Sequence, residues 1–387
     1  MKLLATWVHK AHQRGASDVH LESGFPAAFR IMGALQIGEQ IINANEIRNA
    51  IQDQLSDAQW DDFCQRKSID LSLSLAGIRC RLNIFQTVRG LAASIRLFRS
   101  AVPNLDVLNL HPSIAQFLSQ TQGLLLICGA TGSGKSSTTA ALIQEINRKH
   151  ARHIIMLEQP IEYILPPQRS QIRQREVGRD TPSFEQGLLD SLRQDPDVIV
   201  VGEMRKPETI RLTLNASETG HLVIATLHSA NVVEALQRIV ASFPASAQPQ
   251  VCAQLGDCLV GVVSQQLVWN RVAQQRVPVC EVLRANTASR GVIRQNQLHR
   301  LNSVMELGHS DGMWTRSLYQ KWLDGKKQFA KAPKPNVDHD IKEVSRPSLR
   351  RRVLKPSSRP TQDGVFELDE NTDDLASIVA EFSKDKR

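Results

Sequence analysis

A run of small residues, GATGSGKSS at positions 129–137, has the residue types and the spacing that bind a phosphate chain. Four residues separate Gly129 from Gly134, and Lys135 and Ser136 follow directly. In this pattern successive main-chain N–H groups wrap the phosphates, the lysine reaches the outer phosphates, and the hydroxyl binds Mg²⁺. Glycine is needed because a side chain would hold the backbone away from the phosphates. The residues expected to bind the nucleotide are Gly129, Ala130, Thr131, Gly132, Ser133, Gly134, Lys135, Ser136 and Ser137.

The segments on either side of this loop support a phosphate site over an ordinary Gly/Ser turn. The apolar run 124–128 has the length of a buried strand, and Leu142, Ile143 and Ile146 recur at helical spacing. A glycine loop between a strand and a helix is the context in which a phosphate loop works. The sequence therefore predicts binding of ATP together with Mg²⁺.

Carboxylates follow two further apolar runs of strand length. DVIVVG is followed by Glu203, and HIIML is followed by Glu158. A carboxylate delivered by a buried strand beside a phosphate loop orients Mg²⁺, directly or through water, and helps to align the attacking water. We therefore assign Ser136 and Glu203 to the metal. Glu158 and Glu162 are both candidates to polarise water, and the alternative for each is a surface loop.

A third apolar run, HLVIATL, begins at His221 and is followed by His228. A neutral imidazole can sense the γ-phosphate by hydrogen bonding, although a lone histidine also serves structural roles. His228 comes at the strand end, where ligands bind in open α/β sheets. We include both histidines among the candidate catalytic residues.

Apolar strands that alternate with helical segments predict an α/β domain with a largely parallel sheet at 106–325. Residues 1–105 instead predict a small α+β domain. The run 28–35 alternates as a strand does, two more runs turn near Gly77 as a hairpin, and 93–98 continues it. Between them, Ile47, Ile51 and Leu55 share one face of a predicted helix.

Arginines collect on one face of the predicted hairpin. Arg79 and Arg81 alternate with Ile78, Cys80 and Leu82 and so lie on the opposite face. Arg89 and Arg96 extend this cationic surface, which is either simply solvated or binds a phosphate.

The composition bounds the protein class. With 387 residues and 41% hydrophobic residues, the chain is long enough for two packed domains. Apolar runs fall short of the roughly 18–20 residues of a membrane span. The apolar stretch within the first residues, MKLLATWVHKAH, is too short for a signal peptide, so we expect a cytoplasmic protein. The cysteines form no Cys-x2-Cys pair, which argues against a zinc site and a disulfide framework: Cys64, Cys80, Cys128, Cys252, Cys258 and Cys280.

The net charge of +8 is unevenly distributed. Residues 326–359 hold 11 basic and 3 acidic side chains, whereas 360–387 hold 3 and 8. Rich in proline and charge and poor in apolar groups, residues 326–387 are predicted to be a disordered tail, in which DDLASIVAEF has the spacing of an amphipathic helix. The body lacks a concentrated basic stripe, and only 5% of residues are aromatic, which argues against nucleic acid as a partner.

Taken in order, several motifs resemble the signatures of the secretion ATPase superfamily, most of all the pilus-retraction ATPases of type IV pilus systems. They are ASDVHL, GATGSGKSS, LEQPIEY, QREVG, LRQDPDVIVVGEMR and SETGHLVIATLH. The resemblance runs from about residue 1 to 325. It implies a PAS-like N-terminal domain, a RecA-like P-loop ATPase domain, and a homo-hexameric ring with ATP at the junction between the domains.

The resemblance also implies roles for individual residues. Glu158 falls in the acidic box, Glu203 in the second Walker motif, and His221 and His228 in the histidine box. The segment RCRLNIFQTVRGLAASIR matches the one whose arginines reach nucleotide in that superfamily, with Arg81 and Arg96 as the preferred candidates. The implied partner is a platform protein of a pilus or secretion machine, which would hold the motor at the inner membrane.

Three features depart from the superfamily pattern. Gln159 replaces the aspartate of the acidic box, which removes a carboxylate. A late segment typical of retraction enzymes is kept only at Arg290, Ile293 and Arg294. The tetracysteine zinc site of the assembly and secretion relatives is missing, which favours retraction over extension.

Three hypotheses on function follow. The first is an ATP-hydrolysing motor of a type IV pilus or related secretion system that powers retraction. The second is a nucleic-acid translocase on the same RecA-like scaffold. The basic half of the tail is compatible with it. The third is a nucleotide-binding regulatory subunit with little hydrolysis, motivated by Gln159.

Overall fold

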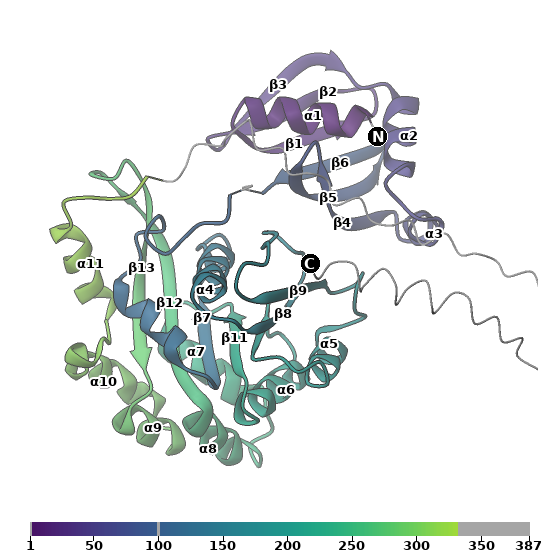
Figure 1. The fold of residues 1–387 in the computed structure, drawn as a ribbon. Coiled ribbons are helices and arrows are strands. Elements are labelled where there is room, and N and C mark those ends of the chain that lie inside the picture. The colour runs from purple at the N-terminus through teal and green to yellow at the C-terminus, as the bar shows by residue number, and fades with distance from the viewer. Residues whose placement is uncertain (1, 99–100, 332–387) are drawn as a thin grey trace, which may run out of the picture. The chain divides into compact units, whose positions relative to one another are not determined.

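The computed structural model describes residues 2–98 and 101–331 of the chain (Figure 1). Most of the predicted tail, including the segment DDLASIVAEF, lies outside the described residues. Residues 326–331, where that tail begins, form neither helix nor strand.

Residues 2–97 form an antiparallel sheet with strand order β3-β2-β1-β6-β5-β4, packed with three helices. Its core contains Leu21, Phe29, Ile47, Leu82 and Ile95. The predicted α+β arrangement is therefore present. The elements are α1 (Lys2–Gln13), β1 (Ala16–Glu22), β2 (Pro26–Ile31), β3 (Ala34–Ile41), α2 (Ala44–Gln52), α3 (Asp57–Arg66), β4 (Ser68–Leu75), β5 (Ile78–Thr87) and β6 (Gly90–Leu97).

The local predictions for this sheet meet mixed outcomes. The hairpin turning near Gly77 is confirmed, because β4 and β5 pair on either side of it. The prediction of a single strand at 28–35 is wrong. Met32 and Gly33 have φ values of 50° and 88°, so the chain turns there and 28–35 is shared between β2 and β3.

Residues 112–325 form a second sheet with strand order β13-β12-β7-β11-β10-β8-β9. Every neighbouring pair is parallel except β12–β13, which confirms the predicted parallel sheet. The strands are β7 (Gly123–Cys128), β8 (His153–Glu158), β9 (Gln171–Glu176), β10 (Val198–Val201), β11 (Leu222–Leu227), β12 (Leu259–Asn270) and β13 (Gln275–Arg284). The α-helices are α4 (Lys135–Lys149), α5 (Phe184–Ser191), α6 (Pro207–Glu218), α7 (Val232–Ala241), α8 (Gln248–Cys258), α9 (Thr287–Arg294), α10 (Leu301–Leu307) and α11 (Arg316–Gly325), with 3-10 turns η1 (Pro112–Ser119), η2 (Leu298–Arg300) and η3 (His309–Asp311).

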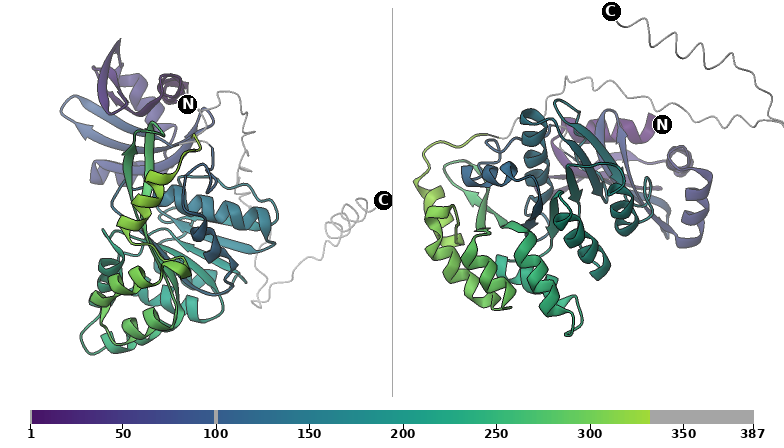
Figure 2. Two further views of the ribbon diagram at one scale, coloured as in Figure 1. Left: turned by 90° about the vertical axis from the view of Figure 1, so that its left-hand side faces the viewer. Right: turned by 60° about the horizontal axis from the view of Figure 1, so that its bottom comes forward.

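Apolar cores lie on both faces of the second sheet. In β7, Leu124 and Leu126 enter one core with residues of α6, α7 and α8, whereas Leu125 and Ile127 enter the other with residues of α4, η1 and α11. Helices α9, α10 and α11 follow the β12–β13 hairpin on one side of this domain (Figure 2). A strand buried on both faces explains why β7 reads as an unbroken apolar run.

The two sheets lie on either side of the predicted domain boundary near residue 105, and that boundary stays a prediction. Of the six cysteines, five are buried and Cys64 is exposed. In the part of the chain that the structure describes, no helix has both the length and the apolar character to cross a bilayer.

Candidate nucleotide site

The glycine loop lies between β7 and α4, as its sequence pattern predicts. Gly129 has φ +150°, and a Cβ placed on it would come within 2.4 Å of the Gln265 main-chain oxygen on β12 and of the Ser133 Oγ. At the N-cap of α4, Gly134 adopts φ 90° and brings no side chain to cap the first N–H groups. The loop is thus packed against β12 on one side and leaves helix N–H groups for an anion.

Lys135 starts α4 and reaches back over the loop. Its Nζ donates to the main-chain oxygens of Gly129 at 2.8 Å and Ala130 at 3.0 Å. Burial lowers the pKa of this ammonium, and the nearby Glu203 carboxylate opposes that shift. The cation is therefore held at the loop, where the outer phosphates are expected.

The parallel sheet brings the predicted strand-end residues to one edge. Since β7, β11, β10 and β8 are neighbours and run parallel, their carboxyl ends coincide. His228 lies between the other two groups: its Nε2 is 3.2 Å from Glu203 Oε1, and its Nδ1 is 3.4 Å from Lys135 Nζ. These contacts fit a neutral ring that donates from Nε2 to the carboxylate and accepts from the lysine at Nδ1.

The charges around this edge favour that protonation pattern. Burial and the charge of Lys135 lower the pKa of His228, against the attraction of Glu203. Burial alone would raise the pKa of Glu203, but a hydrogen bond from Arg205, with the charges of Arg205, His228 and Lys135, holds it below 4.5. Arg205 Nη2 lies 2.6 Å from Glu203 Oε2. At neutral pH the site therefore presents an ionised carboxylate, a neutral imidazole and an ammonium.

Glu158 at the end of β8 has a different environment. Burial raises its pKa to about 7, and the neighbouring carboxylates Glu162 and Glu176 add to the rise. Gln174 donates from Nε2 to Glu158 Oε1 at 3.1 Å, which opposes the shift. A carboxylate with a pKa near neutrality is suited to accept a proton from water.

Glu162 lies close to the glycine loop, which the sequence alone could not show. The Ser136 hydroxyl hydrogen-bonds to its carboxylate, and one residue later the Tyr163 hydroxyl lies 2.8 Å from Ser137 Oγ. Burial raises the pKa of Glu162, while Ser136 and the charges of Arg81 and Arg96 lower it. The sequence indicated Glu162 only as a second carboxylate after β8, and three-dimensional proximity to Ser136 distinguishes it.

His221 does not join this group. It precedes β11, and its carbonyl accepts a hydrogen bond from the N–H of Gly123, the first residue of β7. Its ring Nδ1 is 3.0 Å from the main-chain oxygen of Ala216 at the end of α6. Six strand residues separate it from His228, roughly 20 Å at the usual rise, so it lies at the opposite edge of the sheet.

The two predicted arginines are ion-paired within the first sheet. Arg81 Nη2 lies 3.0 Å from Asp70 Oδ2, and Arg96 Nε lies 2.8 Å from Asp18 Oδ1. Their side chains remain about half exposed or more, at 47% and 64%. The Arg81–Asp70 pair is about half exposed on both sides, and such a pair contributes about 0–1 kcal/mol, so exchanging the Asp70 carboxylate for a phosphate costs little. Asp18 is instead buried, so a phosphate that took Arg96 from it would leave a buried carboxylate with one partner fewer.

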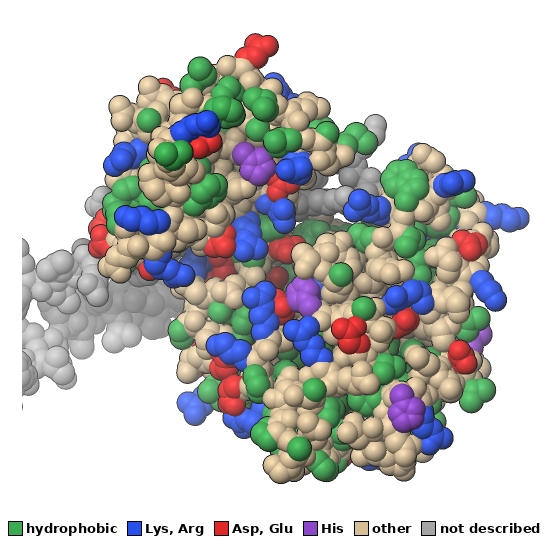
Figure 3. Space-filling view, turned by 180° about the vertical axis from the view of Figure 1, so that it is seen from behind, with side chains coloured by type: hydrophobic (Ala, Val, Ile, Leu, Met, Phe, Trp, Pro, Cys, Tyr) green, Lys and Arg blue, Asp and Glu red, His purple; other side chains and the backbone are tan. Residues whose placement is uncertain are grey.

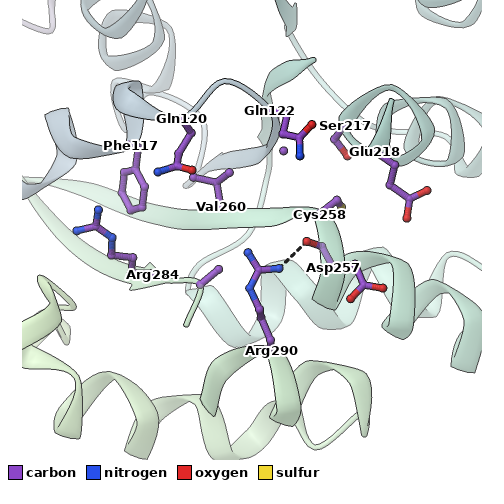
Figure 4. Close-up of a pocket in the computed structure, with 12 residues that line it drawn as sticks. Phe117, Gln120, Gln122, Ser217, Glu218, Asp257, Cys258, Val260, Arg284 and Arg290 are labelled. Atoms are coloured by element: carbon purple, nitrogen blue, oxygen red, sulfur yellow. Dashed lines mark hydrogen bonds between the residues drawn. The ribbon is translucent and has the colours of Figure 1, made fainter. Parts of the chain in front are cut away.

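The three residues kept from the retraction-type segment have packing roles here. Arg290 donates to the main-chain oxygens of Gly256 and Leu259 at the end of α8, at 2.7 and 3.0 Å. Ile293 is fully buried, and Arg294 pairs with Asp257. Arg290 also lines a cavity of about 370 Å³ (Figure 4), which reaches Gly123 and so lies at the edge away from the phosphate loop.

On the face shown in Figure 3, Lys and Arg side chains are interspersed with Asp and Glu and do not form one continuous basic area. On this face the described side chains therefore form no extended track for a phosphate backbone.

Comparison with known proteins shows which chains this one is similar to. A family model described as "Type II/IV secretion system protein" matches residues 1–332. A "Twitching motility protein" of Neisseria gonorrhoeae is 42% identical over 276 residues, 71% of this chain and 74% of that protein. The pilus retraction ATPase PilT of Pseudomonas aeruginosa is 36% identical over 316 residues, 81% and 92% of the two chains. A crystal structure of the pilus retraction motor PilT with bound ADP covers 87% of this chain and 98% of that chain, at a TM-score of 0.77 and 35% identity.

Proposed function

Since the chain belongs to the type II/IV secretion system protein family and is an ATPase of that family, we propose that it is the motor that powers retraction of a type IV pilus. The observation that carries this proposal is the meeting of Lys135, His228 and Glu203 at one sheet edge. It occurs in a chain that is 35% identical to a pilus retraction motor over 87% of its length.

The residues at this edge divide the work of phosphoryl transfer. The loop N–H groups and Lys135 neutralise charge that develops on the γ-phosphoryl oxygens, and this positioning and electrostatic stabilisation is the main contribution of such sites. Glu158, with a pKa of about 7, accepts a proton from the attacking water. His228 connects the phosphate side at Lys135 to Glu203 and so reports on the presence of the γ-phosphate.

The donor set at the loop fits Mg²⁺. Ser136 and Glu203 supply a hydroxyl and an ionised carboxylate, and Mg²⁺ prefers such oxygen ligands together with phosphates. When bound, the metal would neutralise charge on the β- and γ-phosphates.

The wider assembly is also part of the proposal. We infer a ring of six copies with ATP at the junction between the two domains, where Arg81 and Arg96 reach the nucleotide. The ring would act from the cytoplasm on a platform protein of the inner membrane. The relatives named as a pilus retraction ATPase and as a pilus retraction motor with bound ADP support the use of a nucleotide for pilus retraction in this setting.

The test of the chemistry is steady-state ATP hydrolysis by purified protein. Lys135→Ala and Glu203→Gln are expected to lower kcat by about 10²-fold or more, the usual effect of removing a preorganised transition-state contact. Lys149→Ala and Glu208→Gln are matched controls, because both side chains are exposed: Lys149 is the last residue of α4, and Glu208, in the first turn of α6, pairs with Arg211. Wild-type turnover in Lys135→Ala or Glu203→Gln would overturn the role proposed for that side chain.

The test of the direction of work is a deletion in cells. Surface pili accumulate and twitching stops if the protein retracts pili, whereas pili vanish if it assembles them. ATPase activity that DNA stimulates in a salt-sensitive manner would instead select the translocase hypothesis.

A further inference from the structure

Gln265 on β12 packs against the glycine loop at both ends of the loop. Ser264, the residue before it, pairs with Cys128, the last residue of β7, so Gln265 lies beside the point where β7 runs into the loop. Its main-chain oxygen would be 2.4 Å from a Cβ on Gly129, and its side-chain Nε2 would be 3.1 Å from a Cβ on Gly134. One residue of the neighbouring strand therefore adjoins the first and the last glycine of the loop.

The side chain of Gln265 also fixes the direction of one peptide group in the loop. Its Nε2 donates to the main-chain oxygen of Ser133 at 2.6 Å in a buried hydrogen bond. The peptide from Ser133 to Gly134 is trans, and in a trans peptide the carbonyl and the following N–H point in opposite directions. Because the Ser133 carbonyl faces Gln265, the N–H of Gly134 is directed away from β12. Gly134 is the N-cap of α4, so this N–H is one of the helix-start donors that an anion can use.

The same hydrogen bond determines which way the amide of Gln265 faces. If the amide were reversed, its Oε1 would face the Ser133 oxygen, and two acceptors would meet. With the NH₂ group directed at Ser133, Oε1 is buried in a residue that is 2% exposed, and it has no hydrogen-bond partner among the described residues. An unpaired buried acceptor disfavours folding. Stability therefore does not explain an amide at this position, and functional sites are where proteins keep such unfavourable groups.

The Gly134 N–H is expected to contact a phosphate that ATP and ADP share. In a loop of this pattern the main-chain N–H groups surround the α- and β-phosphates, whereas the lysine reaches the β- and γ-phosphates. A donor that is already oriented needs no rearrangement when the ligand arrives. A side chain that holds the Ser133–Gly134 peptide in place therefore strengthens the binding of both nucleotides.

We propose that Gln265 is a positioning residue for the nucleotide, whose amide holds the Ser133–Gly134 peptide with its N–H directed at the α- and β-phosphates. It acts through the main chain of the loop and not by contact with the substrate. This role rests on the proposed ATPase function.

The direct test is the nucleotide affinity of Gln265→Met, which keeps the length of the side chain and removes its donor. We expect the Kd for ATP and the Kd for ADP each to rise about tenfold, equivalent to about 1.4 kcal/mol, because both nucleotides carry the α- and β-phosphates. Gln266→Met is the matched control. Gln266 is exposed, and successive strand residues point to opposite faces, so its affinities should equal those of wild type.

Urea unfolding without nucleotide separates positioning of the loop from a general role in the fold. Gln265→Met exchanges one unpaired buried acceptor, Oε1 of Gln265, for another, the main-chain oxygen of Ser133. The number of unpaired acceptors stays the same, so the midpoint of unfolding should stay close to that of wild type.

Gln265→Glu adds a pH dependence that a purely structural role would not produce. The ionised carboxylate has no hydrogen for the Ser133 oxygen and brings a negative charge close to the phosphates, so ADP affinity near pH 8 should fall further than in Gln265→Met. A protonated carboxyl group can donate to Ser133 again, and burial favours the protonated form. The ADP affinity of this variant, divided by that of wild type at the same pH, should therefore recover as pH falls from about 8 to about 5.

The outcomes that contradict the two proposals differ. Wild-type ADP affinity in Gln265→Met, a loss confined to ATP, or an affinity loss accompanied by a lower unfolding midpoint would overturn the role of Gln265. An affinity ratio in Gln265→Glu that does not change with pH would overturn it as well. Absence of ATP hydrolysis by the wild-type protein would instead overturn the proposed function.

Discussion

Replacement of Gly129 by alanine tests the phosphate loop where the structure leaves least room. The new Cβ would lie 2.4 Å from the Gln265 oxygen, a backbone atom in β12, and 2.4 Å from Ser133 Oγ. It would also hold an alanine at φ +150°, which costs on the order of 1–3 kcal/mol. Because β12 is paired on both sides, the loop must move instead, and we expect a total cost of about 3 kcal/mol or more.

Gly132→Ala is the matched comparison within the same loop. Gly132 has φ +76°, but nothing lies within 4 Å of its would-be Cβ, so only the backbone strain of about 1–2 kcal/mol applies. In a titration with a fluorescent ATP analogue, Gly129→Ala should weaken binding at least about 100-fold and Gly132→Ala at most about 30-fold. Equal affinities for the two variants, or wild-type affinity for Gly129→Ala, would refute the steric reasoning.

Three further predictions concern the strand-end residues. His228→Ala should lower kcat by about 10²-fold in an activity assay. His221→Ala, at the sheet edge away from the phosphate loop, should leave ATP affinity within about twofold in a binding assay. Glu158→Gln should be more stable than wild type at pH 8 by a few kcal/mol, as urea unfolding at pH 5 and pH 8 measures. Between pH 4.5 and 7 the carboxyl of Glu158 keeps its proton in the folded state and loses it in the unfolded state, so the wild type loses stability as pH rises through this range. The ionised Glu203 stabilises the fold above pH 4.5, and this contribution is lost as pH falls through its lowered pKa, so the stability of wild type and Glu203→Gln should converge on acidification in the same unfolding assay.

Much of the second sheet could be predicted because the sequence signals of its strands are local. Four apolar runs correspond to β7, β8, β10 and β11, and the glycine loop after the first run and a polar residue after each of the other three mark their carboxyl ends. Parallel connection through helices then places these ends together without any long-range detail. The convergence of the loop with Glu203 and His228 follows from that topology.

The parts that sequence could not predict depend on contacts between distant segments. Gln174 and Glu158 are 16 residues apart on neighbouring strands, and their hydrogen bond requires the register of β8 and β9. His221 illustrates the converse. It belongs to the same short motif as His228, yet a strand between them places the two rings at opposite edges. The prediction of one strand at 28–35 is wrong for a local reason, because a turn at Met32 and Gly33 interrupts the alternating run.

The carboxylates of the candidate site have different surroundings, and this difference is the strongest physical reason for the different roles proposed for them. Glu203 lies beside Arg205, His228 and Lys135, which keep its pKa low and leave it ionised for a metal. Glu158 is buried with carboxylates as neighbours, which raise its pKa to about 7 and let it exchange a proton with water. Two carboxyl groups whose pKa values are driven apart can act as permanent charge and as base in one site. Gln159, which replaces the second acidic residue next to Glu158, fits this division: another carboxylate there would raise the pKa of the base further, so Gln159→Asp is expected to move the rise of kcat to higher pH.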